Sequence, residues 1–269
     1  MTISYCRLAA AVAATMMLGF STVRASAENW FSGDWYLTVG AAGFIAPRFE
    51  GSKSSVFTAS PLISLGRAGS FTRFSSRNDN MSFALFEAGT LRAGPVGKIV
   101  FGRDDGDADE LKGLDPVKWG AEVGVFAEVY PTDWLRIRGE VRHGIRSHSG
   151  VVGDIYVDAF QDITPDVRIS GGPRLSFGSA KYLDAYYGVS ADEAARSGLG
   201  AYTPESGLTS IGVGGAVTWK TTEKITTSAF SEYRRLLGPA KDSSLVRERG
   251  SPNQFMLGVS GTYRFDFTM

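Results

Sequence analysis

The sequence has very little cysteine and histidine: one cysteine, Cys6, and two histidines, His143 and His148. A single cysteine supports neither an intramolecular disulfide framework nor a cysteine-based zinc site. Basic and acidic residues are equal in number, 28 of each, whereas a protein that neutralises nucleic-acid phosphates normally has a basic excess. We therefore expect no nucleic-acid partner and no cofactor.

Long apolar runs are also missing after residue 27, so no transmembrane helix is expected there. The one apolar run, residues 8–20, follows Arg7 and precedes the small-residue motif at 25–27. It is shorter than the roughly 20 residues that cross a hydrocarbon core. We predict a secretory signal peptide over residues 1–27, cleaved after Ala27 and exported through the Sec pathway, and a single mature domain over residues 28–269.

In the mature chain, apolar and polar residues alternate, as in strands that have one apolar face. Leu135 and Ile137, for example, alternate with Arg136 and Arg138, and the alternation in the closing segment continues to Met269. A soluble β-sandwich would alternate too. Strands of about ten residues, an export signal and an aromatic last strand favour a barrel in the outer membrane of a Gram-negative bacterium.

The fold class that we predict is all-β: a transmembrane antiparallel up-and-down β-barrel of about 12 strands, although ten or fourteen also fit. The connections alternate between short turns and mostly longer loops, which places both termini in the periplasm. The alternation is weakest in the third, fourth and fifth strands. The predicted strands are 34–45, 55–66, 69–77, 80–88, 91–102, 117–130, 133–145, 151–162, 165–178, 208–220, 223–236 and 253–268.

The polar faces of these strands would carry charge into the lumen of the barrel. A turn centred on Thr132 places Glu128 opposite Arg136 and Glu122 opposite Arg142, and such cross-strand pairs are stabilising. The pairs either keep a filled lumen neutral or line a selective passage, and both interpretations stay open. The candidate lumen charges are Glu122, Glu128, Arg136, Arg138, Glu140, Arg142, Arg168 and Arg174.

The longest connection, 179–207, contains signals for a short helix. Ser190 and Glu193 have the spacing of a capping box, and Gly198 is placed to end the helix. We predict a helix over residues 191–197 that either fastens the loop over the barrel or binds a partner.

Two other features suggest chemistry but lack the required pattern. The acidic run 104–110 has the first spacing of a calcium loop, but its glycine and its last ligand are misplaced, so we expect a solvated loop and no metal site. His143 lies on the apolar parity of its strand, and no carboxylate is placed to orient it or His148. We therefore expect a protein that is not an enzyme.

Two long blocks of the sequence resemble the MltA-interacting protein MipA / OmpV family of outer-membrane proteins. The first comprises residues 187–190, 194–199 and 201–202, and the second residues 233–246; shorter matches are 102–104 and 263–265. The resemblance covers essentially the whole mature chain, although four residues follow the family's usual Tyr-Arg-Phe ending. The motif residues singled out are Tyr187, Gly188, Ala195, Arg196, Ser197, Gly198, Leu199, Tyr202, Tyr233, Leu236, Leu237 and Gly238.

The resemblance implies an outer-membrane barrel without catalytic residues. For one founding member it implies a scaffold between a murein lytic transglycosylase and a murein synthase, and other members are linked to adhesion or to stress response. The expected function is a non-enzymatic envelope scaffold in contact with outer-membrane lipid and lipopolysaccharide; a narrow pore for small solutes and a surface adhesin are the alternatives. The topology places the motif blocks outside the cell, whereas a periplasmic partner would contact the short turns.

Overall fold

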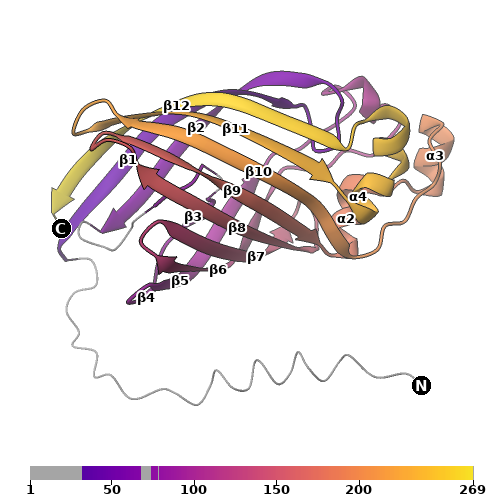
Figure 1. Ribbon diagram of the computed structural model, residues 1–269. Coiled ribbons are helices and arrows are strands. Elements are labelled where there is room, and N and C mark those ends of the chain that lie inside the picture. Colours follow the sequence, from indigo (N-terminus) through magenta and orange to yellow (C-terminus); the bar gives the residue numbers. More distant parts are fainter. Residues whose placement is uncertain (1–31, 68–73, 78, 269) are drawn as a thin grey trace, which may run out of the picture.

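The computed structural model describes residues 32–67, 74–77 and 79–268, so the predicted signal peptide lies outside the described residues. The chain forms a nearly closed antiparallel β-barrel with a helical cap at one end (Figure 1). Within the described residues, no helix has the length and apolar character needed to cross a membrane.

One antiparallel sheet of twelve strands forms the barrel, as predicted, and the first long strand pairs with the last. Chain neighbours pair with each other around most of the sheet, which is the up-and-down arrangement. The strands are β1 (Asp34–Pro47), β2 (Ser55–Arg67), β3 (Met81–Ser82), β4 (Phe86–Ala88), β5 (Leu91–Val100), β6 (Gly120–Thr132), β7 (Leu135–Ile145), β8 (Val151–Asp162), β9 (Val167–Gly178), β10 (Gly207–Lys220), β11 (Ile225–Leu236) and β12 (Asn253–Thr268).

The sheet departs from the prediction between β2 and β5. Of the strand predicted over residues 69–77, the part that the structure describes, 74–77, is not a strand. The strand predicted over 80–88 is split into β3 and β4, which both pair with β5 and are separated by an irregular step. Such a step is a β-bulge, so β3 and β4 share one position in the wall. Among the described residues β2 and β3 do not pair, and the sheet stays open there.

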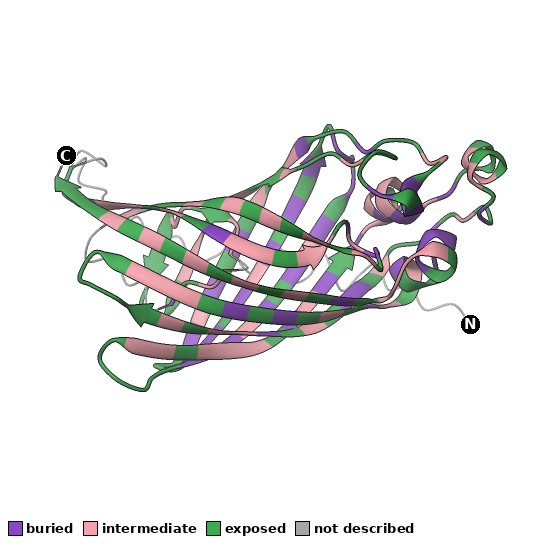
Figure 2. Ribbon diagram, turned by 90° about the horizontal axis from the view of Figure 1, so that it is seen from above, coloured by how far each residue is buried: buried purple, intermediate pink, exposed green. Residues whose placement is uncertain are grey.

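Strand parity separates two faces. On β6 and β7 the odd-numbered side chains point outward and are exposed, such as Val125 and Val141, while even-numbered ones such as Glu128 and Arg136 are buried (Figure 2). Large exposed aromatic side chains lie near both rims, including Trp119 at one and Trp219 at the other. An apolar outer band with aromatic girdles is typical of an outer-membrane barrel.

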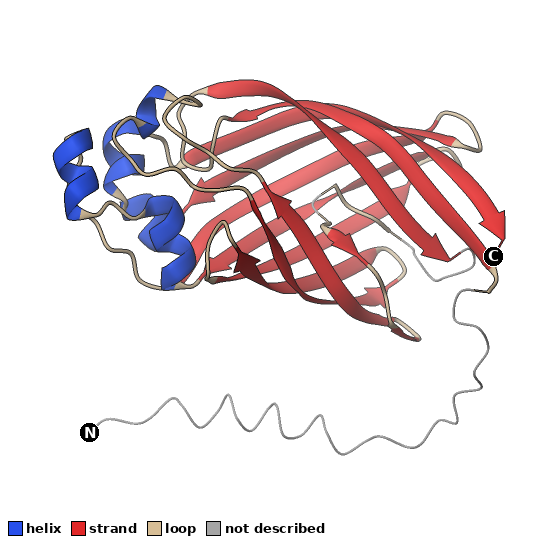
Figure 3. Ribbon diagram, turned by 180° about the vertical axis from the view of Figure 1, so that it is seen from behind, coloured by secondary structure: helices blue, strands red, loops and turns tan. Residues whose placement is uncertain are grey.

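The two ends of the barrel differ. The cap end carries the long connections, and the other end carries short turns at 89–90, 133–134 and 221–224 together with the start of β1 and the end of β12 (Figure 3). The cap contains three α-helices and two shorter helical turns. These are α2 (Ala180–Tyr187), α3 (Ala191–Ser197), α4 (Gly238–Asp242), the 3₁₀ turn η2 (Asp109–Leu111) and the π-type turn η3 (Leu245–Arg249).

The helix predicted over residues 191–197 is confirmed as α3. The Ser190 side chain accepts a hydrogen bond from the Glu193 backbone, and the Glu193 carboxylate accepts one from the Ser190 backbone at 2.8 Å. Gly198 ends the helix with φ 76°, a conformation that glycine adopts without strain. The Asp115 backbone N–H also donates to Glu193 at 2.9 Å, which ties α3 to the neighbouring loop.

These hydrogen bonds make α3 sensitive to pH. Partial burial alone would raise the pKa of Glu193, but the backbone donors of Asp115 and Ser190 outweigh it and lower the pKa below 4.5. A lowered pKa stabilises the folded state at neutral pH, and the contribution is lost as the pH falls below 4.5 and the carboxylate takes up a proton. Amide exchange protection over 191–197, corrected for intrinsic rates, should therefore fall on acidification. Glu193→Gln should remove that dependence; a wild-type helix equally protected at both pH values would contradict it.

Candidate functional site

The inward faces of β6 to β8 carry a ladder of buried ion pairs. Arg142 binds Glu122 at 2.8 Å and Asp154 at 2.6 Å, and Arg138 binds Glu128 at 3.0 Å. Each of these residues is at most 8% exposed. A charge removed from water in this way is tolerated only when it is paired, so each member depends on its neighbours.

Two carboxylates of the ladder, Asp154 and Asp158, were absent from the predicted set. Asp158 accepts hydrogen bonds from Arg136 at 2.7 Å and from Arg174. Glu140 connects the ion pairs of Arg138 with those of Arg142, since both arginines bind it. The signal that could have found these aspartates is the parity of β8, where both occupy inward positions.

The predicted register of the β6–β7 hairpin is wrong by two residues. Glu128 lies opposite Arg138, and Ala127 lies opposite Gly139. The pairing is irregular between Val129 and Thr132, which moves the turn toward Leu135. Contact between the predicted partners survives diagonally, because long side chains reach past a neighbouring position.

Arg168 lies apart from the ladder. It sits at the short-turn rim, where its side chain is 33% exposed and binds the exposed Asp162 at 2.7 Å. The other seven candidate lumen charges are buried in the interior, and Arg174 joins β9 to β8 through Asp158.

A segment preceding β3 crosses the interior of the barrel, and we name residues 74–77 with 79–80 the inner segment. Asp79 accepts hydrogen bonds from the two terminal nitrogens of Arg136 at 2.7 and 2.8 Å. Asn80 donates to Glu140 at 2.6 Å, and Ser82 accepts from Arg138 at 3.0 Å. The inner segment is thus fixed to the charged wall by side-chain contacts.

Its other contacts reach further around the wall. The Phe74 ring stacks on Phe160 of β8, with centroids 4.7 Å apart. The Arg77 guanidinium lies 4.4 Å from the ring centres of Phe44 on β1 and Phe230 on β11. Wall side chains just fill the interior of a barrel of about eight strands, so a wider barrel has space left over. The inner segment occupies that space, which explains why these residues do not close the wall as a strand.

Four of the twelve motif residues, Tyr187, Leu199, Tyr202 and Leu236, pack in two apolar clusters of the cap. One cluster combines Leu183 and Tyr187 of α2 with Leu236, Ala240 and Val246 from the region around α4 and η3. A second cluster brings Leu199 against residues of the first long loop and of η2 and η3. These clusters fasten four separate connections to one another over the mouth of the barrel.

Hydrogen bonds and backbone conformation account for several other motif positions. Tyr202 donates to the Pro239 carbonyl at 2.9 Å, and Arg196 binds Asp115. Gly238 has φ 45°, a conformation that favours glycine where α4 begins. Tyr233 instead lies on the outer face of β11. Of the remaining motif residues, Gly188 and Gly198 end helices, Ala195 is exposed on α3, Ser197 binds the Leu199 backbone, and Leu237 precedes α4.

His148 connects the cap to the ladder. The expectation that no carboxylate is placed to orient its ring was wrong. Its Nε2 lies 3.2 Å from a Glu122 oxygen, and the Gly150 backbone donates to its Nδ1. The rings of Tyr182 and Tyr186 on α2 pack edge-on against it. The loop after β7 folds back over the lumen and brings His148 to a carboxylate far away in sequence. His143 faces outward, as its parity indicated.

The acidic run 104–110 is only partly solvated, which corrects the expectation of an exposed loop. Asp105 is exposed, but Glu110 is buried and accepts hydrogen bonds from Ser52 and Ser54 at 3.2 and 3.0 Å. In the part of the chain that the structure describes, no group of three or more His, Cys, Asp or Glu side chains is arranged to hold a metal ion.

The buried ladder makes a quantitative prediction. Asp158→Asn should destabilise the barrel by about 3–5 kcal/mol, because Arg136 and Arg174 both lose a buried charged partner. Asp162→Asn removes the same charge from an exposed pair and should cost about 0–1 kcal/mol. Urea unfolding in lipid vesicles, followed by tryptophan fluorescence, measures both. An equal loss of unfolding free energy in the two variants would show that burial of the ion pair does not increase its contribution to stability.

The chain is similar to several solved structures and matches one family model. Solved structures that resemble the chain are a KdgM porin (10% identity, 87% of this chain and 99% of that one, TM-score 0.37) and Neisserial surface protein A (11%, 87% and 99%, 0.27). A third is a bacterial polysaccharide outer membrane secretin (8%, 87% and 99%, 0.40). Among curated proteins none matches. The family model of the MltA-interacting protein MipA matches residues 39–265, and the chain therefore belongs to that family of outer-membrane β-barrel proteins.

Proposed function

We propose that this chain is a non-enzymatic scaffold of the outer membrane that brings murein-cleaving and murein-synthesising enzymes together. The observation that carries the proposal is the filled interior, in which the inner segment is bound to Arg136 and the cap covers one mouth. A barrel whose lumen is occupied and whose mouth is covered is suited to act through its surfaces. The family's name, MltA-interacting protein, supports a murein-related partner.

The balance of charge in the wall supports a structural role for the candidate lumen residues. Five arginines and five carboxylates from β5 to β9 bind one another, and a neutral ladder needs no mobile counter-ion. In this proposal the pairs fix the shape of the barrel, and Arg168 serves only the rim. The residues are Arg92, Arg136, Arg138, Arg142 and Arg174 with Glu122, Glu128, Glu140, Asp154 and Asp158.

The short-turn end is the surface that we assign to the partner. The motif blocks are engaged in the packing of the cap, and in an outer-membrane barrel the short turns face the periplasm, where murein lies. Trp134 and Ile163 are 55% and 56% exposed at this end. Exposed large apolar side chains beside turns are suited to anchor a protein interface.

Crosslinking in intact envelopes, followed by pull-down and mass spectrometry, tests the scaffold. The wild-type barrel should recover lytic transglycosylases or murein synthases, and Trp134→Ala with Ile163→Ala should reduce their yield at least about tenfold, as the loss of anchor residues does. Phe101→Ala, at the opposite rim, is the matched control and should recover them fully. Recovery of only lipopolysaccharide and barrel-assembly proteins would refute the scaffold.

A narrow pore is the second candidate, and one observation favours it. Residues 74–77 and 79–80 are held to the wall by side chains, they form no strand pairing with any described residue, and the described sheet is open beside them. A segment attached in this way can be released without breaking a ladder of backbone hydrogen bonds. If it leaves, Arg136 and Arg138 face the vacated space.

Planar-bilayer conductance separates the two candidates. The scaffold predicts that the wild-type barrel and Asp79→Asn are both electrically silent, because the cap still covers the mouth. The pore predicts that Asp79→Asn opens far more often than wild type and prefers anions, since the freed Arg136 attracts them. Asp162→Asn, which removes an equal charge outside the lumen, is the control for both. Frequent openings of Asp79→Asn alone would replace the scaffold by a gated pore.

A further inference from the structure

Arg146 departs from the pattern of β7, which ends one residue before it. Even-numbered residues of β7 face the lumen, so regular continuation would place Arg146 above Arg142. Its backbone instead has φ 75°, and among the described residues it is the only one besides glycine with a positive φ. Its guanidinium lies 4.0 Å from the centre of the Trp119 ring, whose side chain is 60% exposed on the outer face. An unusual backbone conformation thus accompanies an arginine placed on the outer rim, which invites a functional explanation.

This arginine has no acidic partner in the described part of the chain, unlike those of the ladder. Lys118, the residue before Trp119, is also exposed and forms no ion pair with a described carboxylate. Two uncompensated cations therefore lie at the cap end of β6 and β7: Arg146 contacts the exposed tryptophan, and Lys118 precedes it in the sequence. Stacking on the indole restricts the guanidinium and leaves its N–H groups available to an anion.

The position matches the level of lipid headgroups. Exposed tryptophans of membrane barrels lie in the girdle between hydrocarbon and water. Arginine binds phosphate through paired, charge-assisted hydrogen bonds, and lysine supplements it as a point charge. The chemistry that complements this rim is the phosphate of a membrane lipid.

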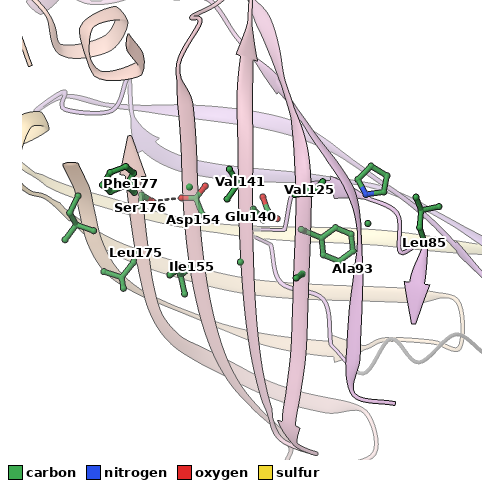
Figure 4. A pocket seen from close by; sticks show the side chains of 17 residues that line it. Leu85, Ala93, Val125, Glu140, Val141, Asp154, Ile155, Leu175, Ser176 and Phe177 are labelled. Atoms are coloured by element: carbon green, nitrogen blue, oxygen red, sulfur yellow. Dashed lines mark hydrogen bonds between the residues drawn. The ribbon is translucent and has the colours of Figure 1, made fainter. Parts of the chain in front are cut away.

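Below the rim the outer wall is hollowed. A hollow of about 1010 Å³ runs across the strands from β5 to β10 and is lined mainly by outward apolar side chains. Figure 4 shows Phe177 on β9, Val141 on β7 and Val125 on β6 along it. In the strand register, Phe177 lies opposite Gly153, Gly153 opposite Val141, and Val141 opposite Val125. The hollow and the cationic rim therefore share β6 and β7.

Two glycines create the space. A Cβ atom added to Gly139 would meet nothing within 4 Å, and one added to Gly153 would make only ordinary contacts. Both have φ outside the left-handed region. Steric conflict therefore does not require glycine at either position, and its effect is to keep the wall concave. A dry concave surface within the membrane is complementary to acyl chains.

We propose that the rim and the hollow form one site for a phosphorylated lipid of the outer leaflet, of the lipopolysaccharide class. Its phosphate binds Arg146 and Lys118, and its acyl chains lie in the hollow over Gly139 and Gly153. The two halves are complementary to the two ends of the same amphipathic molecule. The site is independent of the scaffold, since it lies at the cap end and on the outer face.

Native mass spectrometry of the full barrel with diphosphoryl lipid A as the probe tests the site. Arg146→Ala with Lys118→Ala should weaken lipid binding at least about tenfold, because charge-assisted hydrogen bonds to phosphate are lost. Gly139→Leu with Gly153→Leu fills the hollow and should also weaken binding while leaving both cations in place. Lys220→Ala with Lys224→Ala removes the same charge at the opposite rim and should bind like wild type. Heat-dependent migration in gels establishes that each variant is folded.

Several results would overturn the proposal. Unchanged lipid binding by the folded Arg146→Ala, Lys118→Ala variant would refute the proposed phosphate contact. Unchanged lipid binding by the Gly139→Leu, Gly153→Leu variant, or complete competition by inorganic phosphate, would refute the proposed contact between the acyl chains and the hollow. An equal loss in the Lys220→Ala, Lys224→Ala control would reduce the effect to net charge.

Discussion

The interior of this barrel depends on how the two terminal nitrogens of the Arg136 guanidinium are paired. It is fully buried, and it binds Asp158 on β8, Glu128 on β6 and Asp79 on the inner segment. A guanidinium never loses its proton in a protein, so its burial demands carboxylates on several sides. Two of these belong to the wall and the third to the inner segment. One side chain therefore links the central strands β6 to β8 to the segment that fills the lumen.

The same constraint explains the asymmetry of the lumen. The inward positions of β10 are mostly small or hydroxylated, such as Gly212, Gly214 and Thr218, whereas β6 to β8 carry long charged side chains. A wide barrel with one long-chain wall and one short-chain wall has unfilled space beside the short wall. Arg77, stacked between Phe44 and Phe230, reaches from the inner segment to β1 and β11, the second of which adjoins β10. The sheet is open near β2 because residues that would otherwise close it lie inside.

Sequence patterns predicted the regular strands and the helix α3. They failed where the backbone conformation depends on side chains that are distant in the sequence. Alternation located β6 to β12 to within a few residues, since each strand there has one face toward lipid and one toward the lumen. Local hydrogen bonds made α3 predictable from Ser190, Glu193 and Gly198 alone. Residues 74–77 were predicted as the end of a strand and Asp79 as part of a short link, because the attachment of this segment to Arg136 depends on contacts that periodicity does not encode. The hairpin register failed for a related reason, as the irregular step before Thr132 leaves no mark in the alternation.

The placement of the motif residues determines which properties of the family can be inferred for this chain from the sequence match. Tyr187 and Leu236 are fully buried in the same apolar cluster, and Leu199 is buried in the other cluster of the cap. Residues committed to an interior in this way specify the cap and leave little surface for a partner. A match in these blocks therefore argues for a shared cap and a sealed mouth more strongly than for a shared partner. In the proposed scaffold the partner binds exposed residues of the short turns, which lie outside the motif blocks.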